Sequence, residues 1–248
     1  MTVPGLAMEH VTVRFGGLIA VDDVTLRIPP GGRHGILGPN GAGKTTLFNA
    51  VTGFTPIQKG TIALGTEDVT SRTAAVRARM GLGRTFQITN LMPSLSTFEN
   101  VLLGALSHLD ERHSWWRPYL SARTSTLRAY QVVHEVGLDN VADQPISELS
   151  YGDRRKVEVA VALAAEPTVL LLDEPTAGLS IAERNSMVDL LLAMPETLTT
   201  VIIEHDMEVM FALADTITVL HRGAEVMTAP TDDVKTNPRV KEIYLGSE

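Results

Sequence analysis

The sequence predicts a mixed α/β core that carries a mostly helical insertion, and three observations support this fold class. Strand-like runs bounded by turn residues occur near both ends of the chain. Between residues 91 and 161 apolar residues recur at intervals of three and four, as in helices. Val169–Leu172 is uniformly apolar, as in a buried parallel strand. We expect one domain over residues 1–248, with a core lobe at about 1–90 and 162–248 and a helical subdomain at about 91–161.

The elements of the core follow from periodicity and turn signals. Residues two apart are apolar in the runs before Gly16–Gly17 and before Pro29–Gly32, which predicts two strands. A short strand at Gly35–Leu37 leads into a glycine-rich loop, and a helix is expected over Lys44–Val51, with Gly53 well placed to stop it. The remaining expected core elements are a strand at Thr61–Leu64, a basic helix around Ala74–Met80, strands at Thr168–Leu172 and Thr199–Ile203, and a hairpin of Ile217–Leu220 with Glu225–Met227 across Arg222–Gly223.

The inserted block is expected to contain helices on both sides of a polar stretch. Helical spacing of apolar residues runs from Leu91 to Ala105 and again from Leu127 to Val136. The stretch between them contains Trp115–Trp116, which either packs within the helical subdomain or forms an exposed contact.

The composition of the 248 residues excludes several function classes. There is no Cys, so disulfides, thiolate nucleophiles, iron–sulfur ligation and Cys-based zinc sites are excluded. The formal net charge of −8 gives no support to a nucleic-acid partner, which usually requires a basic face. No apolar run is long enough to span a bilayer, and the first ten residues lack the features of a secretion signal. We expect a soluble protein located in the cytoplasm.

A phosphate-binding loop is the most specific motif. The pattern G-x-x-x-x-G-K-[ST] is matched at every fixed position by Gly38, Pro39, Asn40, Gly41, Ala42, Gly43, Lys44 and Thr45, followed by Thr46. Glycines allow successive backbone N–H groups to surround a phosphate, and the following helix adds a favourable dipole. Lys44 is expected to reach the β- and γ-phosphates, and the Thr45 hydroxyl to ligate Mg²⁺. An ordinary glycine turn before a capped helix is the alternative.

Two carboxylates follow the buried strand at Val169–Leu172. The carboxyl end of a parallel strand is where such sheets present ligands. Asp173 is expected to hold Mg²⁺, directly or through water, and Glu174 to polarise the water that attacks the γ-phosphate. A solvated acidic turn is the alternative. Together with the phosphate loop, this pair predicts a P-loop NTPase.

Three further elements narrow the class: Leu149–Asp153 before a long helical run, Gln87 after an apolar segment, and His205 after a strand. With the phosphate loop and Asp173–Glu174, this order resembles the nucleotide-binding subunit of ATP-binding cassette (ABC) transporters over nearly the whole chain. The resemblance implies a RecA-like core, an antiparallel β subdomain and an inserted α-helical subdomain, with ATP and Mg²⁺ as cofactors.

The same resemblance implies residue roles. Phe15 matches the aromatic residue that stacks on adenine. Gln87 matches the glutamine that contacts Mg²⁺ and the attacking water and senses the membrane partner. Ser150 and Gly152 match the signature that caps the γ-phosphate from the opposite subunit, and His205 matches the switch histidine.

Each of these roles has a structural alternative. Phe15 could be a core residue, Gln87 a surface amide and His205 a structural histidine. Ser150 and Asp153 fit a plain S-x-x-D capping box, which is compatible with anion binding at the same helix end. The four arginines between Arg72 and Arg84 are interpreted as a solvated helical face rather than as a site for RNA or lipid headgroups.

The chain also departs from the family pattern. Its signature reads Leu-Ser-Tyr-Gly-Asp where L-S-G-G-Q is commonest, so Tyr151 and Asp153 are unusual while Ser150 and Gly152 are kept. The loop after Glu174 has Ser180 where the family usually has Asp.

Several segments resemble one branch of the family, the ATPase subunits of branched-chain amino-acid importers: the signature, Gly81–Gln87, Ile203–Met207 and Ile243–Gly246. The resemblance implies membrane permease subunits, a second ATPase subunit (the same chain or a paralogue), an indirect extracytoplasmic solute-binding protein, and a position on the inner face of the cell membrane. The alternatives are urea or amide import, lipopolysaccharide extraction, and a non-transport ABC ATPase.

Overall fold

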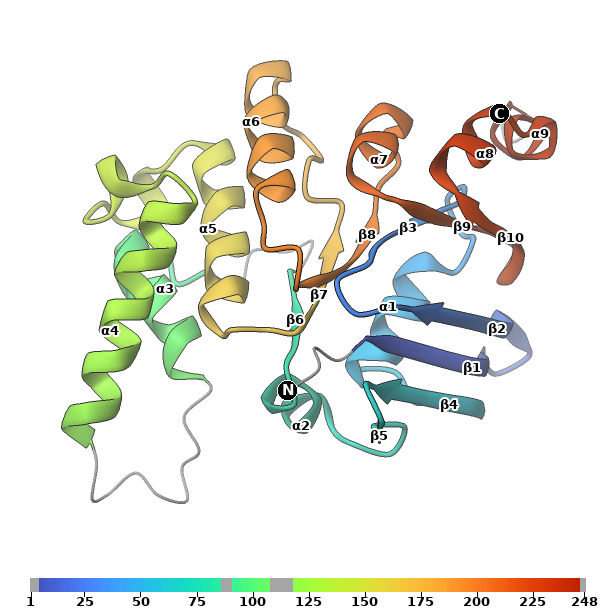
Figure 1. Ribbon diagram of the computed structural model, residues 1–248, viewed down its shortest axis with the longest axis horizontal. Helices are drawn as coiled ribbons and strands as arrows, with labels where there is room; N and C mark the ends of the chain where they lie inside the picture. The colour runs from blue at the N-terminus through green and yellow to red at the C-terminus, as the bar shows by residue number, and fades with distance from the viewer. Residues whose placement is uncertain (1–4, 86–90, 108–117, 246–248) are drawn as a thin grey trace. The chain divides into compact units, whose positions relative to one another are not determined.

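The structure is a computed structural model that describes residues 5–85, 91–107 and 118–245 (Figure 1). The chain divides into two compact units. The first contains Met1–Arg84, Thr168–Glu174 and Leu191–Glu248, and the second contains Thr85–Pro167 and Pro175–Leu190. Each unit is described by itself.

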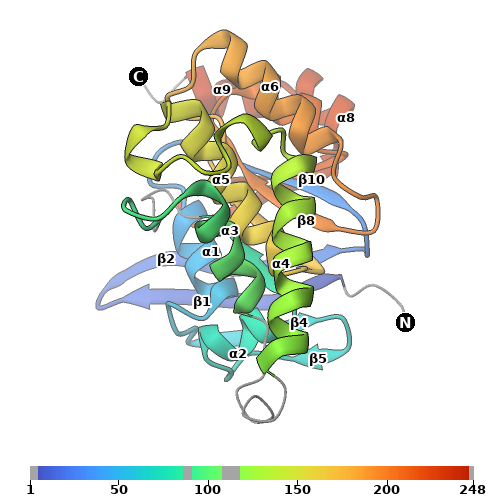
Figure 2. The ribbon, with the colours of Figure 1, turned by 90° about the vertical axis from the view of Figure 1, so that its left-hand side faces the viewer.

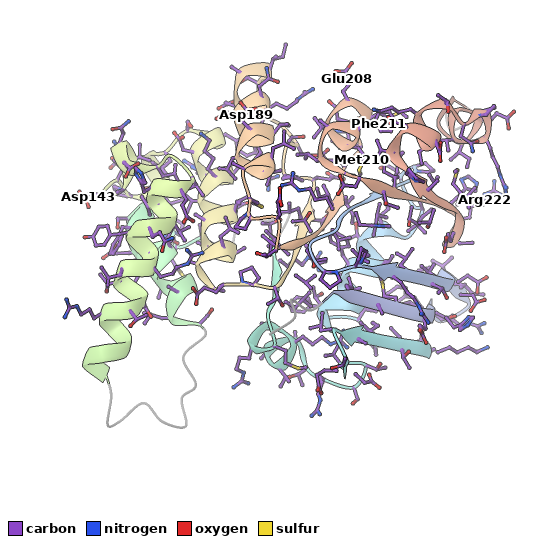
Figure 3. All side chains as sticks on the ribbon, in the orientation of Figure 1. Asp143, Asp189, Glu208, Met210, Phe211 and Arg222 are labelled. Atoms are coloured by element: carbon purple, nitrogen blue, oxygen red, sulfur yellow. The ribbon has the colours of Figure 1, made fainter. Side chains whose placement is uncertain are left out.

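A six-stranded sheet forms the centre of the first unit. Its strand order is β10-β9-β3-β8-β7-β6, and all neighbours are parallel except the β9–β10 hairpin (Figure 1). The strands are β3 (Arg33–Leu37), β6 (Leu82–Arg84), β7 (Val169–Asp173), β8 (Thr199–Ile203), β9 (Thr216–His221) and β10 (Ala224–Pro230). The hairpin turns at Arg222 (Figure 3) and Gly223, as the sequence predicted, and Arg222 has a φ of 50°. Parallel strands bring their carboxyl ends to one edge of this sheet.

A second, antiparallel sheet has the order β2-β1-β4-β5. Its strands are β1 (Leu6–Phe15), β2 (Leu18–Ile28), β4 (Lys59–Leu64) and β5 (Glu67–Asp68). Alternate residues of β2 are buried, which fits a sheet with one face in the core. The expected antiparallel β subdomain is therefore present.

Helices of the first unit cover both faces of the six-stranded sheet. The elements are α1 (Lys44–Thr52), α2 (Ala74–Arg79), α7 (Met207–Leu213), α8 (Thr231–Thr236) and α9 (Pro238–Leu245). Phe48 of α1 belongs to a buried cluster that includes residues from both sheets. On α7, Met210 is fully buried while Glu208 is exposed and points away (Figure 3). A Cβ at Gly35 would overlap the sulfur of Met210, so glycine lets α7 pack closely on β3.

The second unit is helical. It contains α3 (Thr97–Leu106), α4 (Pro118–Glu135), two short 3₁₀ turns, η2 (Asp139–Val141) and η3 (Ile146–Glu148), α5 (Tyr151–Ala164) and most of α6 (Ile181–Leu192). Figures 1 and 2 show α3, α4 and α5 side by side. A Cβ at Gly104 would overlap the carbonyl oxygen of Val161, so this glycine permits close approach of α3 and α5.

One detail of the helical unit differs from the prediction made from the sequence. Helix α3 begins at Thr97 rather than near Leu91, because Ser96 and Glu99 form a reciprocal capping box. Trp115 and Trp116 lie outside the described residues. No helix in the described part of the chain is long and apolar enough to cross a membrane.

Candidate nucleotide-binding site

The sequence-predicted groups of the first unit are gathered at the carboxyl ends of adjacent parallel strands. The phosphate loop follows β3, Asp173 ends β7, and His205 follows β8 by two residues. The register aligns them, because Ile203 of β8 pairs with Ile36 on one side and with Asp173 on the other. A sheet edge of this kind is where open α/β folds bind their ligands.

The phosphate loop has the backbone conformation that its glycines allow. Gly41 and Gly43 have φ values of 79° and 100°, which L side chains rarely adopt. A Cβ at Gly43 would also overlap the carbonyl oxygen of Ala20. The loop is supported from outside, since the N–H of Gly223 donates to the carbonyl oxygen of Ala42 at 3.0 Å. The loop is therefore held between β2 and the β9–β10 turn.

Lys44 forms hydrogen bonds with the main chain of the phosphate loop. Its side chain is buried, and its Nζ donates to the carbonyl oxygens of Gly38 at 2.5 Å and Pro39 at 3.1 Å. Burial lowers the pKa of Lys44, while the charges of Glu174 and Asp173 act in the opposite direction. Both carboxylates are thus close enough for their field to reach the lysine.

The first turn of α1 suits an anion. Gly43 is the N-cap and provides no side-chain cap, and the first turn contains no acidic residue. Thr45 lies in this turn and is exposed, and Thr46 is partly exposed. The unpaired N–H groups and positive dipole of such a helix end are chemically matched to phosphate.

Asp173 and Glu174 lie side by side in sequence but in different environments. Asp173 is 1% exposed, and its Oδ2 accepts a hydrogen bond from Arg84 at 3.0 Å. Burial raises the pKa of Asp173, and the hydrogen bond and charge of Arg84 oppose that rise. Glu174 is only partly buried and has a φ of 49°. Its N–H donates to the carbonyl oxygen of Ile203 at 2.9 Å. This main-chain contact holds Glu174 in an uncommon left-handed conformation at the sheet edge.

His205 and Phe15 are both accessible. The His205 side chain is 62% exposed, and the main-chain N–H of His205 donates to Glu204 Oε2 at 3.2 Å. Phe15 is 53% exposed at the end of β1, beside exposed Leu18, so it is not a core residue. Gln87 lies outside the described residues.

The signature residues belong to the second unit and sit at the N-terminus of α5. Ser150 is the N-cap: its Oγ accepts from the Asp153 N–H at 3.0 Å and donates to Asp153 Oδ2 at 2.7 Å. The expected N-cap is therefore present, but the Asp153 carboxylate accepts from the Ser150 hydroxyl and not from its main-chain N–H, as a reciprocal capping box would require. Gly152 is approached by a carboxylate, since a Cβ there would lie 2.5 Å from Oε1 of Glu183.

Glu183 connects the signature to the loop after Glu174. It accepts from the Ser180 hydroxyl at 2.6 Å and from the Ser180 N–H at 3.0 Å, and also from the N–H of Gly152. The Ser180 hydroxyl is the largest cause of a lowered pKa at Glu183. Tyr151 donates from its hydroxyl to the carbonyl oxygen of Ala177 in the same loop at 3.3 Å. Two of the three unusual residues, Tyr151 and Ser180, thus take part in this connection.

Two of the four arginines that were predicted to lie on a solvated helical face are buried. Arg72 and Arg79 are exposed, but Arg77 is 3% exposed and the Arg84 side chain is 8% exposed. Arg77 donates to main-chain carbonyls, and Arg84 reaches Asp173. The spacing of residues in the sequence did not show that Arg77 and Arg84 are buried, because their acceptors are main-chain atoms or residues distant in sequence. The available signal for the burial of Arg84 was the short strand β6, which ends at this residue.

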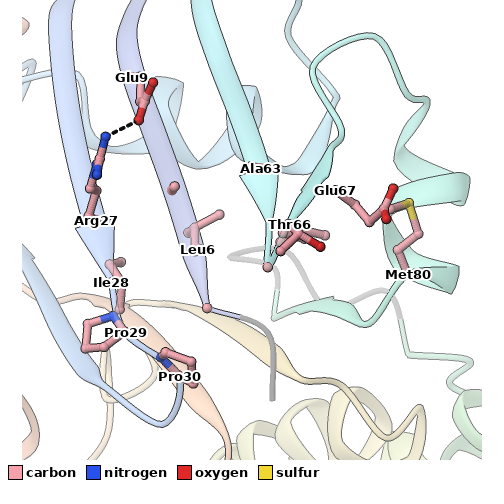
Figure 4. A pocket seen from close by; sticks show the side chains of 14 residues that line it. Leu6, Glu9, Arg27, Ile28, Pro29, Pro30, Ala63, Thr66, Glu67 and Met80 are labelled. Atoms are coloured by element: carbon pink, nitrogen blue, oxygen red, sulfur yellow. Dashed lines mark hydrogen bonds and ion pairs between the residues drawn. The ribbon is translucent and has the colours of Figure 1, made fainter. Parts of the chain in front are cut away.

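A separate hollow of about 910 Å³ lies on the antiparallel sheet (Figure 4). Its lining includes Leu6, Pro29 and Met80, and an ion pair joins Arg27 to Glu9 at 2.5 Å. It shares no residue with the candidate nucleotide-binding site.

Known proteins similar to this chain include ATP-binding cassettes of ABC transporters. The family described as "ABC transporter" matches residues 21–177, which include the phosphate loop, the signature and Asp173–Glu174. The ADP-bound ATP-binding cassette MJ1267 of an ABC transporter has a similar structure, with a TM-score of 0.86 and 27% identity over 99% of this chain and 100% of that one. The dimeric cassette MJ0796, bound to ADP and Pi, has a TM-score of 0.78 and 25% identity over 91% and 98%.

The chain belongs to the ATP-binding proteins of ABC transporters, which bind and hydrolyse ATP. The predicted α/β ABC fold is confirmed. Within this family the chain is 35% identical to the high-affinity branched-chain amino acid transport ATP-binding protein LivG of Escherichia coli K12, over 99% of both chains. The resemblance proposed from the motifs is therefore confirmed.

Proposed function

We propose that this protein is the ATP-hydrolysing subunit of an importer of branched-chain amino acids or a related small solute. The observation that carries the proposal is the full-length similarity to LivG, a branched-chain amino acid transport ATP-binding protein. The site supports the catalytic part, because a phosphate-binding loop, two carboxylates and a histidine occupy adjacent strand ends. The solute is handled by other subunits in this proposal.

The proposed roles of the site residues follow from their chemistry. The loop N–H groups and Lys44 bind the β- and γ-phosphates. Hard oxygen ligands are what Mg²⁺ prefers, and it is commonly held by one or two carboxylates together with substrate phosphates. The Thr45 hydroxyl and the Asp173 carboxylate fit this donor set. Bound Mg²⁺ would neutralise developing phosphate charge.

Glu174 is proposed as the general base for the attacking water. Its carboxylate is partly exposed beside Asp173, which suits contact with water. His205 is proposed to contact the γ-phosphate from the next strand, and Gln87 to contact Mg²⁺ and the water. Phe15, exposed at the end of β1, is proposed to stack on adenine.

A complete site is proposed to need two subunits. Ser150 and Gly152 of one subunit would cap the γ-phosphate bound at Lys44 of the other, in a head-to-tail dimer. The dimeric structure of the MJ0796 cassette bound to ADP and Pi supports dimerisation. The second subunit is either the same chain or a paralogue. The other proposed partners are membrane permeases, contacted through the helical subdomain at about 91–161, and indirectly an extracytoplasmic solute-binding protein. The protein would then lie on the inner face of the membrane.

The catalytic proposal is tested with Glu174→Gln, matched by Glu166→Gln. Glu166 is an exposed glutamate in the turn before β7. Glu174→Gln should leave ATP binding intact, nearly stop hydrolysis and accumulate an ATP-bound dimer, measured by phosphate release and size-exclusion chromatography. Glu166→Gln should behave as wild type. Wild-type turnover by Glu174→Gln would show that another residue is the base.

The transport proposal is tested by uptake of labelled leucine in a deletion strain complemented with wild-type protein or with Lys44→Ala. Wild type should restore uptake and Lys44→Ala should not, because the variant loses the cation that binds phosphate. Unchanged leucine uptake after deletion, with loss of urea or short-chain amide uptake, would reassign the solute while keeping the ATPase role.

A further inference from the structure

Arg84 is a buried cation that contacts two functional elements at once. Its Nη2 donates to Asp173 Oδ2 at 3.0 Å. Its Nη1 donates to Asn49 Oδ1 at 2.6 Å and to Thr52 Oγ1 at 3.3 Å. Asn49 and Thr52 lie on α1, the helix that begins with Lys44, and Asp173 ends β7. One guanidinium group therefore joins the phosphate-loop helix to the strand of the acidic pair.

The arrangement uses the shape of arginine and not only its charge. The guanidinium is a planar fork whose two Nη atoms point to different acceptors. Its carbon also lies 5.7 Å from the ring centroid of Phe48, within the range of a cation–π contact. A lysine at this position has a single donor nitrogen and could not serve α1 and β7 in the same way.

Asp173 needs such a partner if its carboxylate is to be ionised and fixed. It is 1% exposed, and burial of a charged carboxylate is unfavourable unless it is paired and hydrogen-bonded. A hydrogen bond from Arg84 both favours the charged form and fixes the rotation of the carboxylate plane. The neighbouring carboxylate of Glu174 adds repulsion that this contact offsets.

We propose that Arg84 is a positioning residue that holds the Asp173 carboxylate, relative to α1, in the orientation required to bind Mg²⁺ with ATP. The inference rests on the proposed role of Asp173 and deepens it. Residues that orient a metal ligand contribute to metal affinity without touching the metal.

Arg77, on α2, provides a matched comparison because it also donates to α1. It is also buried, and its Nη1 donates to the carbonyl oxygens of Ala50 at 2.7 Å and Val51 at 2.6 Å, in the last turn of α1. Its other recorded acceptors, Thr70 and Arg72, are also carbonyl oxygens, and none of its recorded hydrogen bonds reaches Asp173. Arg77 therefore supports the helix but not the carboxylate.

The test measures the affinity of the full-length protein for trinitrophenyl-ATP, by fluorescence, in excess chelator and in a titration with Mg²⁺. The magnesium enhancement is the ratio of the two dissociation constants. Arg84→Met should reduce this enhancement by about 10-fold, the lower end of the effect of losing an outer-shell partner. Its affinity in chelator should change little. Arg77→Met should keep the wild-type enhancement.

Two further variants separate positioning from charge. If Arg84 acted only as a positive charge near the metal, Arg84→Met would strengthen Mg²⁺ binding and Arg84→Lys would leave it unchanged. Positioning predicts that both variants weaken it. In an Asp173→Asn background, replacing Arg84 should have no further effect on the enhancement.

An unchanged or increased enhancement in Arg84→Lys would overturn the inference, as would full additivity with Asp173→Asn. Wild-type protein whose ATP affinity does not respond to Mg²⁺ would refute the magnesium role of Asp173 and this inference with it. Failure of the uptake experiment would leave the result for Arg84 intact, so the two proposals fail separately.

Discussion

Replacing Arg77 with methionine removes the buried cation at the C-terminal end of α1. The guanidinium donates to four main-chain carbonyl oxygens, those of Ala50, Val51, Thr70 and Arg72, at 2.6 to 3.1 Å. Burial lowers the pKa of Arg77, which reflects the cost of placing its charge in the core. Methionine keeps the unbranched stem but provides no donor.

The size of the effect follows from the acceptors that are left behind. The two bonds of Nη1 are buried, and leaving a buried acceptor unsatisfied costs about 1–3 kcal/mol. The variant no longer buries a charged guanidinium, which removes a desolvation cost from the folded state. We therefore take the lower half of the range of about 1–3 kcal/mol for each of the two acceptors. We expect a loss of about 3 kcal/mol in the free energy of unfolding, or about 6–12 °C in Tm for a chain of this length.

The assay is thermal unfolding followed by circular dichroism, with Arg79→Met as the matched control. Arg79 lies on the same helix, is exposed, and makes one long hydrogen bond of 3.3 Å to its own helix. Its replacement should change stability by no more than about 0.5 kcal/mol. If the two variants melted within 2 °C of each other, the argument from buried carbonyl acceptors would be refuted.

Two other predictions concern the core. Burial lowers the pKa of His34 to about 4, so between pH 6.5 and 4 the unfolded chain binds a proton that the folded chain does not. The free energy of unfolding should therefore keep its full value above pH 6.5 and fall by about 3 kcal/mol as the pH drops to 4. In urea titrations at several pH values, His34→Gln should reduce this dependence on pH, whereas His10→Gln, at an exposed position, should not. Equal pH dependence in the two variants would contradict the lowered pKa of His34. Gly104→Val should lower the free energy of unfolding by about 1–3 kcal/mol, because the valine would overpack α3 against the Val161 carbonyl. Leu103→Ala, at an exposed neighbouring position, should change the urea midpoint little. A wild-type midpoint for Gly104→Val would mean that α3 can move away from α5.

The core of the fold and the strand-end residues were predictable because their signals are local. Strand periodicity, Gly53 and the Arg222–Gly223 turn placed β3, α1 and β9 within one or two residues, and β10 extends three residues beyond the predicted end at Met227. The start of α3 was missed although Ser96-x-x-Glu99 is a capping signature, since apolar spacing was followed past Pro93. The lesson is that capping residues define helix starts better than periodicity does.

The buried arginines could not be predicted in the same way. The acceptors of Arg77 are main-chain oxygens, which have no sequence signature. The partner of Arg84 is 89 positions away in sequence, and its contact depends on β6 pairing with β7. An arginine-rich segment is interpreted as a solvated surface unless the pairing of its strand is known. Here Arg84 of this segment contributes to the site through its contact with Asp173.

The support of the phosphate loop by Gly223 has a consequence for biosynthesis. The loop residues leave the ribosome well before the turn at Gly223, whose N–H supports Ala42. A nascent chain that stops before β9 has the complete phosphate-loop motif but not its supporting turn or neighbouring strand. We therefore expect the loop to reach its final shape late in synthesis, so that ribosome-bound chains arrested before residue 216 do not retain ATP while full-length chains do.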